Sequence, residues 1–164
     1  MTVAERDGVA LVEPTQEDVA YVQDGYDGDF EPDDGETAHD LIKVQIHRLL
    51  VVDVGNDERL GLVSWHPVMY GPTAGCVAWN IGIGLLRSAR GRGVGTTSQR
   101  LLVEHLFATT PYGRIEAGTD VENIAEQKAL EKAGLIREGL IRGAHTRGGV
   151  RRDMVMYGIL RTDL

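Results

Sequence analysis

The residues from Arg90 to Thr96 read R-G-R-G-V-G-T, and they lie between an apolar segment and a helical pattern. Gly91, Gly93 and Gly95 allow successive backbone N–H groups to turn toward one point at the start of that helix. Such a cluster of amides, together with the helix dipole, binds an anion and most often a phosphate group. The segment therefore predicts a phosphate-binding loop.

Two common kinds of phosphate loop do not fit this segment. An ATP- or GTP-binding P-loop needs Lys followed by Ser or Thr after its last glycine, but Thr96 and Thr97 follow Gly95. A dinucleotide fingerprint needs the spacing G-x-G-x-x-G and an acid about 20 residues later at the end of a second strand. The spacing here is G-x-G-x-G, and no such acid follows.

A third pattern, Arg90-x-x-Gly93-x-Gly95, resembles the pyrophosphate-binding signature Q/R-x-x-G-x-G/A of the GNAT superfamily of acetyl-CoA-dependent N-acetyltransferases. Further segments resemble its RimJ/RimL-type branch, which acetylates ribosomal-protein N-termini and diverse small amines: 114–117, 121–125, 130–135, 137–139 and 142–143. The resemblance covers residues 76–160 well and residues 1–75 only by element order. It implies an α/β GNAT fold, in which a mixed central sheet splays at the cofactor cleft and is flanked by helices.

The resemblance implies acetyl-CoA as co-substrate, no metal, and a defined set of cofactor-binding residues. The CoA pyrophosphate would be held by the loop residues Arg90, Gly91, Arg92, Gly93, Val94, Gly95 and Thr96. The strand end at Leu85, Leu86 and Arg87 would pair with the pantetheine arm, and the Leu85 amide would polarise the thioester carbonyl. Asn123 matches a family asparagine that hydrogen-bonds near the pantetheine, and it equally suits the N-cap of the following helix.

Leu85, Asn80 and Glu126 are the candidate catalytic positions, and two of them depart from the family pattern. Asn80 stands where this branch commonly has an acid that acts as general base, and asparagine accepts no proton near neutral pH. Glu126 stands where a serine commonly protonates the thiolate, and a carboxylate is expected to be ionised there. The tyrosine that other members use as the acid is absent from Ala129 and Leu130.

The missing base restricts the acceptor amine. Deprotonating a lysine-like amine at pH 7 costs about 4.6 kcal/mol, whereas an α-amine with a pKa near 8 costs about 1.4 kcal/mol. This difference favours a peptide N-terminus, an amino acid derivative or an amino sugar, unless water relays the proton through Asn80. His66, His145, Glu13 and Glu138 are the candidates for the end of that relay.

The predicted function is transfer of an acetyl or other short acyl group from acyl-CoA to a primary amine by direct attack in a ternary complex. Because two proton-transfer positions are altered, two alternatives remain open. One is a CoA-binding regulatory or accessory module with little or no turnover. The other is a phosphate-loop protein of another fold.

The strand that leads into the glycine loop spans 76–86 and alternates large apolar residues with small ones. The small face includes Gly82 and Gly84, which indicates that a helix or ligand comes close there. We take the two glycines as the basis of a hypothesis that the site accepts a larger donor or acceptor than usual.

The remaining pattern predicts one mixed α/β domain over residues 1–164. Strands are expected over 9–12, 49–54, 60–65, 115–118, 135–142 and 154–160, and helices from Thr15, around Leu41, Val44 and Leu49, and over 96–107 and 123–133.

Charge is unevenly distributed along the chain of 164 residues, whose net charge is −8 and which holds 21 glycines. Residues 1–75 contain 4 Lys and Arg against 16 Asp and Glu, and residues 76–164 contain 13 against 9. Acids are dense from Asp24 to Glu36, which is predicted to be a mobile loop. The resemblance to the GNAT superfamily implies that this loop shapes the acceptor pocket, which favours a cationic acceptor. The acidic total disfavours general binding to nucleic acid or anionic membranes.

The cellular compartment and the oligomeric state are predicted from less specific features of the sequence. Cys76 is the single cysteine, no apolar run of about 18 residues exists, and no charged-then-apolar leader precedes Val9, so we expect a cytoplasmic protein. An apolar patch of Trp65, Val68, Met69 and Tyr70 would suit a homodimer.

Overall fold

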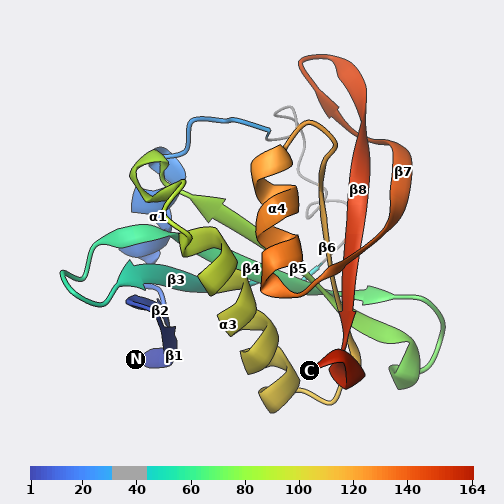
Figure 1. Cartoon of the computed structure of the whole chain (residues 1–164), viewed down its shortest axis with the longest axis horizontal. Coiled ribbons are helices and arrows are strands. Elements are labelled where there is room, and N and C mark those ends of the chain that lie inside the picture. Colours follow the sequence, from blue (N-terminus) through green and yellow to red (C-terminus); the bar gives the residue numbers. More distant parts are fainter. Residues whose placement is uncertain (31–43) are drawn as a thin grey trace.

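The computed structural model describes residues 1–30 and 44–164, and within them eight strands form one sheet in the order β1-β2-β3-β4-β5-β6-β8-β7 (Figure 1). The strands are β1 Thr2–Arg6, β2 Val9–Val12, β3 His47–Asp53, β4 Arg59–Met69, β5 Val77–Leu85, β6 Arg114–Asp120, β7 Ile136–Arg147 and β8 Val150–Leu160. The helices are α1 Gln16–Asp24, α3 Val94–Thr109 and α4 Ile124–Ala133. The predicted α/β fold class with a mixed sheet is confirmed.

The sheet opens between β5 and β6. These strands form the parallel pair of an otherwise antiparallel sheet, and they pair at Trp79 with Ile115 and at Asn80 with Glu116. Beyond these residues each strand keeps its outer partner, since β5 pairs with β4 as far as Leu85 and β6 pairs with β8 through residue 120. The strands therefore diverge toward their C-terminal ends, which is the predicted splay.

Helices cover both faces of the sheet. Figure 1 shows α3 and α4 together in front of the strands and α1 behind them. On the α3/α4 face, Leu102 and Leu106 pack with Ile81 and Ile115 in the main core. On the α1 face a smaller cluster consists of Val22, Leu50 and Leu62. Because successive strand residues point to opposite faces, the apolar strands β3 and β4 contribute to both clusters.

The predicted start of α1 and the predicted end of α4 are confirmed. The Thr15 side chain accepts a hydrogen bond from the Asp18 amide at 3.1 Å, and the Asp18 carboxylate accepts one from the Thr15 amide at 2.8 Å. This reciprocal pair caps α1. At the end of α4, Gly134 adopts φ +102°, a left-handed conformation that favours glycine.

One element prediction was wrong, and one strand was missed. The helix expected around Leu41, Val44 and Leu49 cannot include Leu49, which lies in β3 with its side chain buried, while Leu41 lies outside the described residues. The burial of alternate strand faces overrides the local helical spacing here. Strand β1 was not predicted, because its short sequence carries few apolar residues. Within the described ranges, no helix has the length and apolar character needed to cross a bilayer.

Candidate active site

A cleft of about 760 Å³ follows the divergence of β5 and β6 and continues past the start of α3 to α4. Its strand walls are residues 81–85 and 117–120. The predicted cofactor residues that line it are Leu85, Arg90, Gly91, Gly93, Gly95, Thr96 and Asn123. Leu86, Arg87, Arg92 and Val94 are not among its lining residues. The structure thus brings most of the predicted cofactor positions to one cavity.

The glycine loop ends at a helix start with free amides. Gly91 and Gly93 have φ values of +73° and +82°, and Gly93 is the N-cap of α3 without a side-chain capping bond. The Thr97 amide donates to the Gly93 carbonyl at 3.1 Å, which is the first bond of the helix. The amides of the three preceding residues therefore lack an intrahelical acceptor, as an anion site requires.

The edge of β5 beside the cleft also directs backbone groups toward the opening. The Leu86 amide donates to the Leu60 carbonyl of the neighbouring strand at 2.9 Å. Because hydrogen-bonded and outward-facing residues alternate along an antiparallel strand, Leu85 and Ile83 direct their N–H and C=O groups away from β4, toward the opening. The Arg90 guanidinium donates to the Leu85 carbonyl at 3.1 and 3.2 Å, in agreement with this orientation.

Arg90 also binds the segment that follows α1. Its two terminal nitrogens lie 2.8 Å from the two carboxylate oxygens of Asp27, and one of them lies 3.4 Å from Asp29. The hydrogen bond from Arg90 lowers the pKa of the Asp27 carboxyl. Asp27 and Asp29 of the predicted acidic loop are therefore attached to the glycine loop, and acids 31–36 lie outside the described residues. Arg92 makes longer contacts, at 3.5 Å, with Asp53 and the Ser88 carbonyl.

Glu126 lies in the first turn of α4 and lines the cleft. Burial raises the pKa of its carboxyl to about 7, and the nearby Gln99 amide opposes this shift. Gln99 is 1% exposed, and neither atom of its side-chain amide makes a hydrogen bond within the described part of the chain. The expectation that Glu126 is ionised does not hold, because a carboxyl with this pKa is about half protonated at neutral pH.

Asn123 is the N-cap of α4, and its side-chain oxygen accepts the Glu126 amide at 3.2 Å. This confirms the capping role and fixes the turn that carries Glu126. Lys128 and Lys132, one helical turn apart, also line the cleft and add positive charge on the α4 side.

Asn80 does not line the cleft. It lies where β5 and β6 still pair, and its Nδ2 is 3.5 Å from an oxygen of the buried Glu116 carboxylate on the neighbouring strand. Glu116 also accepts hydrogen bonds from Tyr70 and Arg114. The bond to Glu116 raises the pKa of the Tyr70 hydroxyl. A carboxylate is thus present beside Asn80, but it is already bound by three side chains.

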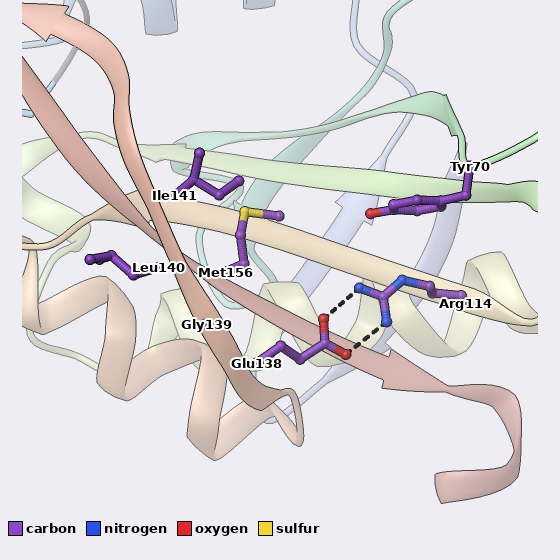
Figure 2. A pocket seen from close by; sticks show the side chains of 7 residues that line it. All are labelled: Tyr70, Arg114, Glu138, Gly139, Leu140, Ile141 and Met156. Carbon is purple, nitrogen blue, oxygen red and sulfur yellow. Dashed lines mark hydrogen bonds and ion pairs between the residues drawn. The ribbon is translucent and has the colours of Figure 1, made fainter.

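A second pocket, of about 460 Å³, opens near Glu116 and is shown in Figure 2. The Glu138 carboxylate binds the Arg114 guanidinium through two hydrogen bonds of 2.6 and 2.7 Å, and apolar side chains of β7 and β8 form the other walls. Glu138 therefore belongs to this pocket and not to the cleft. Within residues 1–30 and 44–164, no three His, Cys, Asp or Glu side chains gather to hold a metal ion.

Among the proposed relay groups, His145 reaches the cleft. Its Nε2 lies 3.1 Å from a carboxylate oxygen of Asp120, which is buried at the end of β6, and its Nδ1 is buried without a hydrogen-bond partner among the described residues. His66 pairs with Asn80 across β4 and β5 and is not a lining residue, and neither is Glu13.

The chain belongs to the GNAT acetyltransferase family: the family model described as "Acetyltransferase (GNAT) domain" matches residues 4–136. This confirms the family and the fold. A curated relative, the probable N-acetyltransferase YjcK of Bacillus subtilis (strain 168), is 31% identical over 123 residues. That match covers 75% of this chain and 66% of the relative, so the chain spans slightly less than two thirds of its length.

Several solved structures of acetyltransferases have the same fold. RimJ of Mycobacterium smegmatis, in complex with CoA-disulfide, has a TM-score of 0.77 at 20% identity, covering 95% of this chain and 83% of that one. The ribosomal-protein-S5-alanine acetyltransferase from Vibrio fischeri has 0.78 at 17%, covering 99% and 98%. Spermidine N-acetyltransferase from Vibrio cholerae, in complex with CoA and spermine, has 0.78 at 16%, covering 96% and 98%.

The lining residues that sequence reasoning missed include Tyr26, Gln99, Asp120 and Lys128. Three of these four lie in helices or strands whose patterns indicated only packing or solvent exposure. Tyr26 lies in the acidic segment, whose many charged residues indicated a loop. Its aromatic ring packs against the apolar cluster of Val22, Leu50 and Leu62.

Proposed function

We propose that this chain transfers an acetyl or other short acyl group from acyl-CoA to a primary amine, by direct attack in a ternary complex. The observation that carries the proposal is the continuity of two sets of free backbone amides along one cleft, at the start of α3 and on the edge of β5. The amides at the start of α3 suit a phosphate group. The amides on the edge of β5 suit an extended ligand that carries amide groups.

The residues present fit acyl-CoA. The amides of Val94, Gly95 and Thr96 would hold the pyrophosphate, with Lys128 and Lys132 adding charge on the opposite side. The open edge at Ile83 and Leu85 would pair with the pantetheine arm as an added strand does. The Leu85 amide would then donate to the thioester oxygen, where negative charge develops during the reaction. Leu86 and Arg87, which were expected to take part in this pairing, lie beyond the end of β5: the Leu86 amide is bonded to Leu60 of β4, and Arg87 begins a 3₁₀ turn.

Glu126 would supply the proton that the leaving group needs. Bound acyl-CoA provides a thioester, whose C–S bond breaks as the C–N bond to the amine forms. The Glu126 carboxyl carries a proton in about half of the molecules at neutral pH, because burial has raised its pKa. It would give this proton to the departing sulfur and regain one from solvent. The nitrogen would lose its proton to water beside His145, which lines the cleft, whereas Asn80 lies outside it.

The acceptor in this proposal is the primary amine of a small molecule or a peptide N-terminus, cationic in bulk solution. Asp120 lines the cleft at the end of β6 but is paired with His145 and Arg147, so its carboxylate does not by itself select a cation. The proteins of similar fold are named for amine substrates of both kinds, a ribosomal-protein alanine and spermidine. We further propose one domain over residues 1–164, a cytoplasmic location and homodimer formation; Met69 and Tyr70 of the predicted patch are 73% and 65% exposed.

The test is release of free thiol from acetyl-CoA with amino sugars, polyamines, amino acids and N-terminal peptides as acceptors, beside calorimetry with CoA, ATP and NAD. Thiol release with at least one amine, and binding of CoA alone among the three nucleotides, would support the proposal. Tight CoA binding without thiol release would instead indicate a regulatory module. Binding of ATP or NAD in place of CoA would refute CoA chemistry.

A further inference from the structure

Gly84 on β5 faces the tip of a tyrosine side chain. A Cβ atom placed on Gly84 would lie 2.1 Å from the hydroxyl oxygen of Tyr26 and 2.3 Å from its Cζ. The same construction on Gly82 would meet only Ser64 Oγ, at 3.1 Å. The phenol of Tyr26 therefore occupies the volume that a side chain at position 84 would take. This corrects the hypothesis that the two glycines leave the site enlarged, since the space over Gly84 is filled.

Tyr26 is held in this position from both sides along the chain. The preceding Gly25 packs so closely that a Cβ there would lie 2.6 Å from Leu86 Cδ2, and the following Asp27 binds Arg90 with both carboxylate oxygens. The ring itself packs against the cluster of Val22, Leu50 and Leu62. These contacts come from helix α1, two strands and the glycine loop, so the phenol is a fixed wall of the cleft.

The Tyr26 phenol lies beside the place where the acyl group would bind. Leu62 lies directly opposite Gly84 across β4 and β5, so both belong to the α1 face of the sheet. Gly84 precedes Leu85, whose amide faces the cleft edge. A thioester carbonyl that accepts the Leu85 amide would place the acyl carbons beside the neighbouring Gly84, and therefore beside the Tyr26 ring. Glu126 and Gln99 lie on the other side of the cleft, on the α3/α4 face.

We propose that Tyr26 limits the length of the acyl group that this site accepts, because its phenol closes the cleft over Gly84. The inference rests on the proposed acyl-CoA function. A two-carbon acyl group fits beneath such a wall, whereas a four-carbon group needs the volume of the ring. A single methylene in a pocket typically changes kcat/KM by about 10- to 200-fold, so the selectivity for acetyl- over butyryl-CoA is expected to be large.

The experiment measures kcat/KM for acetyl-, propionyl- and butyryl-CoA with one fixed acceptor. Tyr26→Ala should lower the acetyl-to-butyryl ratio at least tenfold. The double variant Tyr26→Ala/Gly84→Trp should restore the ratio, because the bulk then comes from the strand. Tyr21→Ala, which removes a half-exposed tyrosine of α1 outside the cleft, is the matched control and should leave the ratio unchanged.

An unchanged ratio in a folded Tyr26→Ala protein would overturn the proposal, and so would a change confined to the KM of the acceptor. If Tyr26→Ala does not fold, Tyr26→Leu keeps an apolar group against Val22, Leu50 and Leu62 and should lower the ratio in the same direction. Failure of the proposed function itself is recognised separately, since the unsubstituted protein would then neither bind CoA nor release thiol.

Discussion

The raised pKa of Glu126 predicts an unusual effect of replacing this residue by glutamine. The carboxyl goes from an ordinary value of 4.5 to about 7 on folding, so the folded state binds more protons than the unfolded state between these values. Stability is then fully present below pH 4.5 and is lost as the pH rises through 7. At 1.36 kcal/mol for each unit, the loss amounts to about 3 kcal/mol.

Glu126→Gln removes this loss, because an amide of the same shape does not ionise. The variant should match the natural protein in unfolding free energy near pH 4 and exceed it by up to about 3 kcal/mol at pH 8. Its activity should change in the opposite direction. Loss of a general acid typically lowers kcat by 10²- to 10⁴-fold, and we expect about 10²-fold because a thiolate is a moderately good leaving group.

The pH profile distinguishes an acid from a residue that merely packs. In the natural protein kcat should decline as the pH rises through about 7, because the protonated form is the active one. In Glu126→Gln this decline should be absent. Urea titrations at pH 4 to 9 and initial rates over the same range provide both readouts.

Glu58→Gln, an exposed substitution of the same kind in the turn between β3 and β4, serves as the control and should alter neither profile. A Glu126→Gln protein with an unchanged kcat, or with an undiminished decline above pH 7, would refute the assignment of Glu126 as the acid. A stability difference that is constant from pH 4 to 9 would refute the raised pKa.

Three further predictions concern cofactor binding. Gly93→Ala forces a side chain into a left-handed conformation at the start of α3 and should cost about 1 kcal/mol in unfolding free energy and weaken CoA binding, as measured by urea titration and calorimetry. Asp27→Asn releases the Arg90 guanidinium from its carboxylate and should tighten CoA binding severalfold at low salt; weaker binding would mean that the ion pair organises the loop. Lys128→Ala should raise the Kd for CoA more at low than at high ionic strength, and an equal effect at both would exclude a role in charge pairing.

The backbone part of the site could be predicted from the sequence, because its signals are local. Alternating glycines before a helix, a capping asparagine at 123 and the strand that ends at Leu85 each specify a conformation within a few residues. The structure has all three in one cleft. The resemblance to the GNAT family depended on these same positions, so it identified the cofactor site more completely than the acceptor site.

The side-chain part could not be predicted, because its partners are distant in sequence. Asp27 binds Arg90 across 63 residues, and Asn80 contacts Glu116 across 36. Tyr26 fills the volume over Gly84 only because α1 packs on the same face of the sheet. No local spacing indicates which side chain will meet a given glycine, and the order of strands in the sheet decides it.

The protonation state of Glu126 could not be predicted from the sequence for the same reason, because the residues that surround its carboxyl are distant in sequence. A glutamate in place of a serine removes the usual proton donor if the carboxyl keeps its ordinary pKa. The pKa depends on burial, which raises it, and on the Gln99 amide of α3, which partly offsets the rise. A carboxyl in this environment keeps its proton in about half of the molecules at neutral pH. The substitution therefore exchanges a hydroxyl donor for a carboxyl donor, and the consequence is activity that depends on pH near 7, which a serine would not confer.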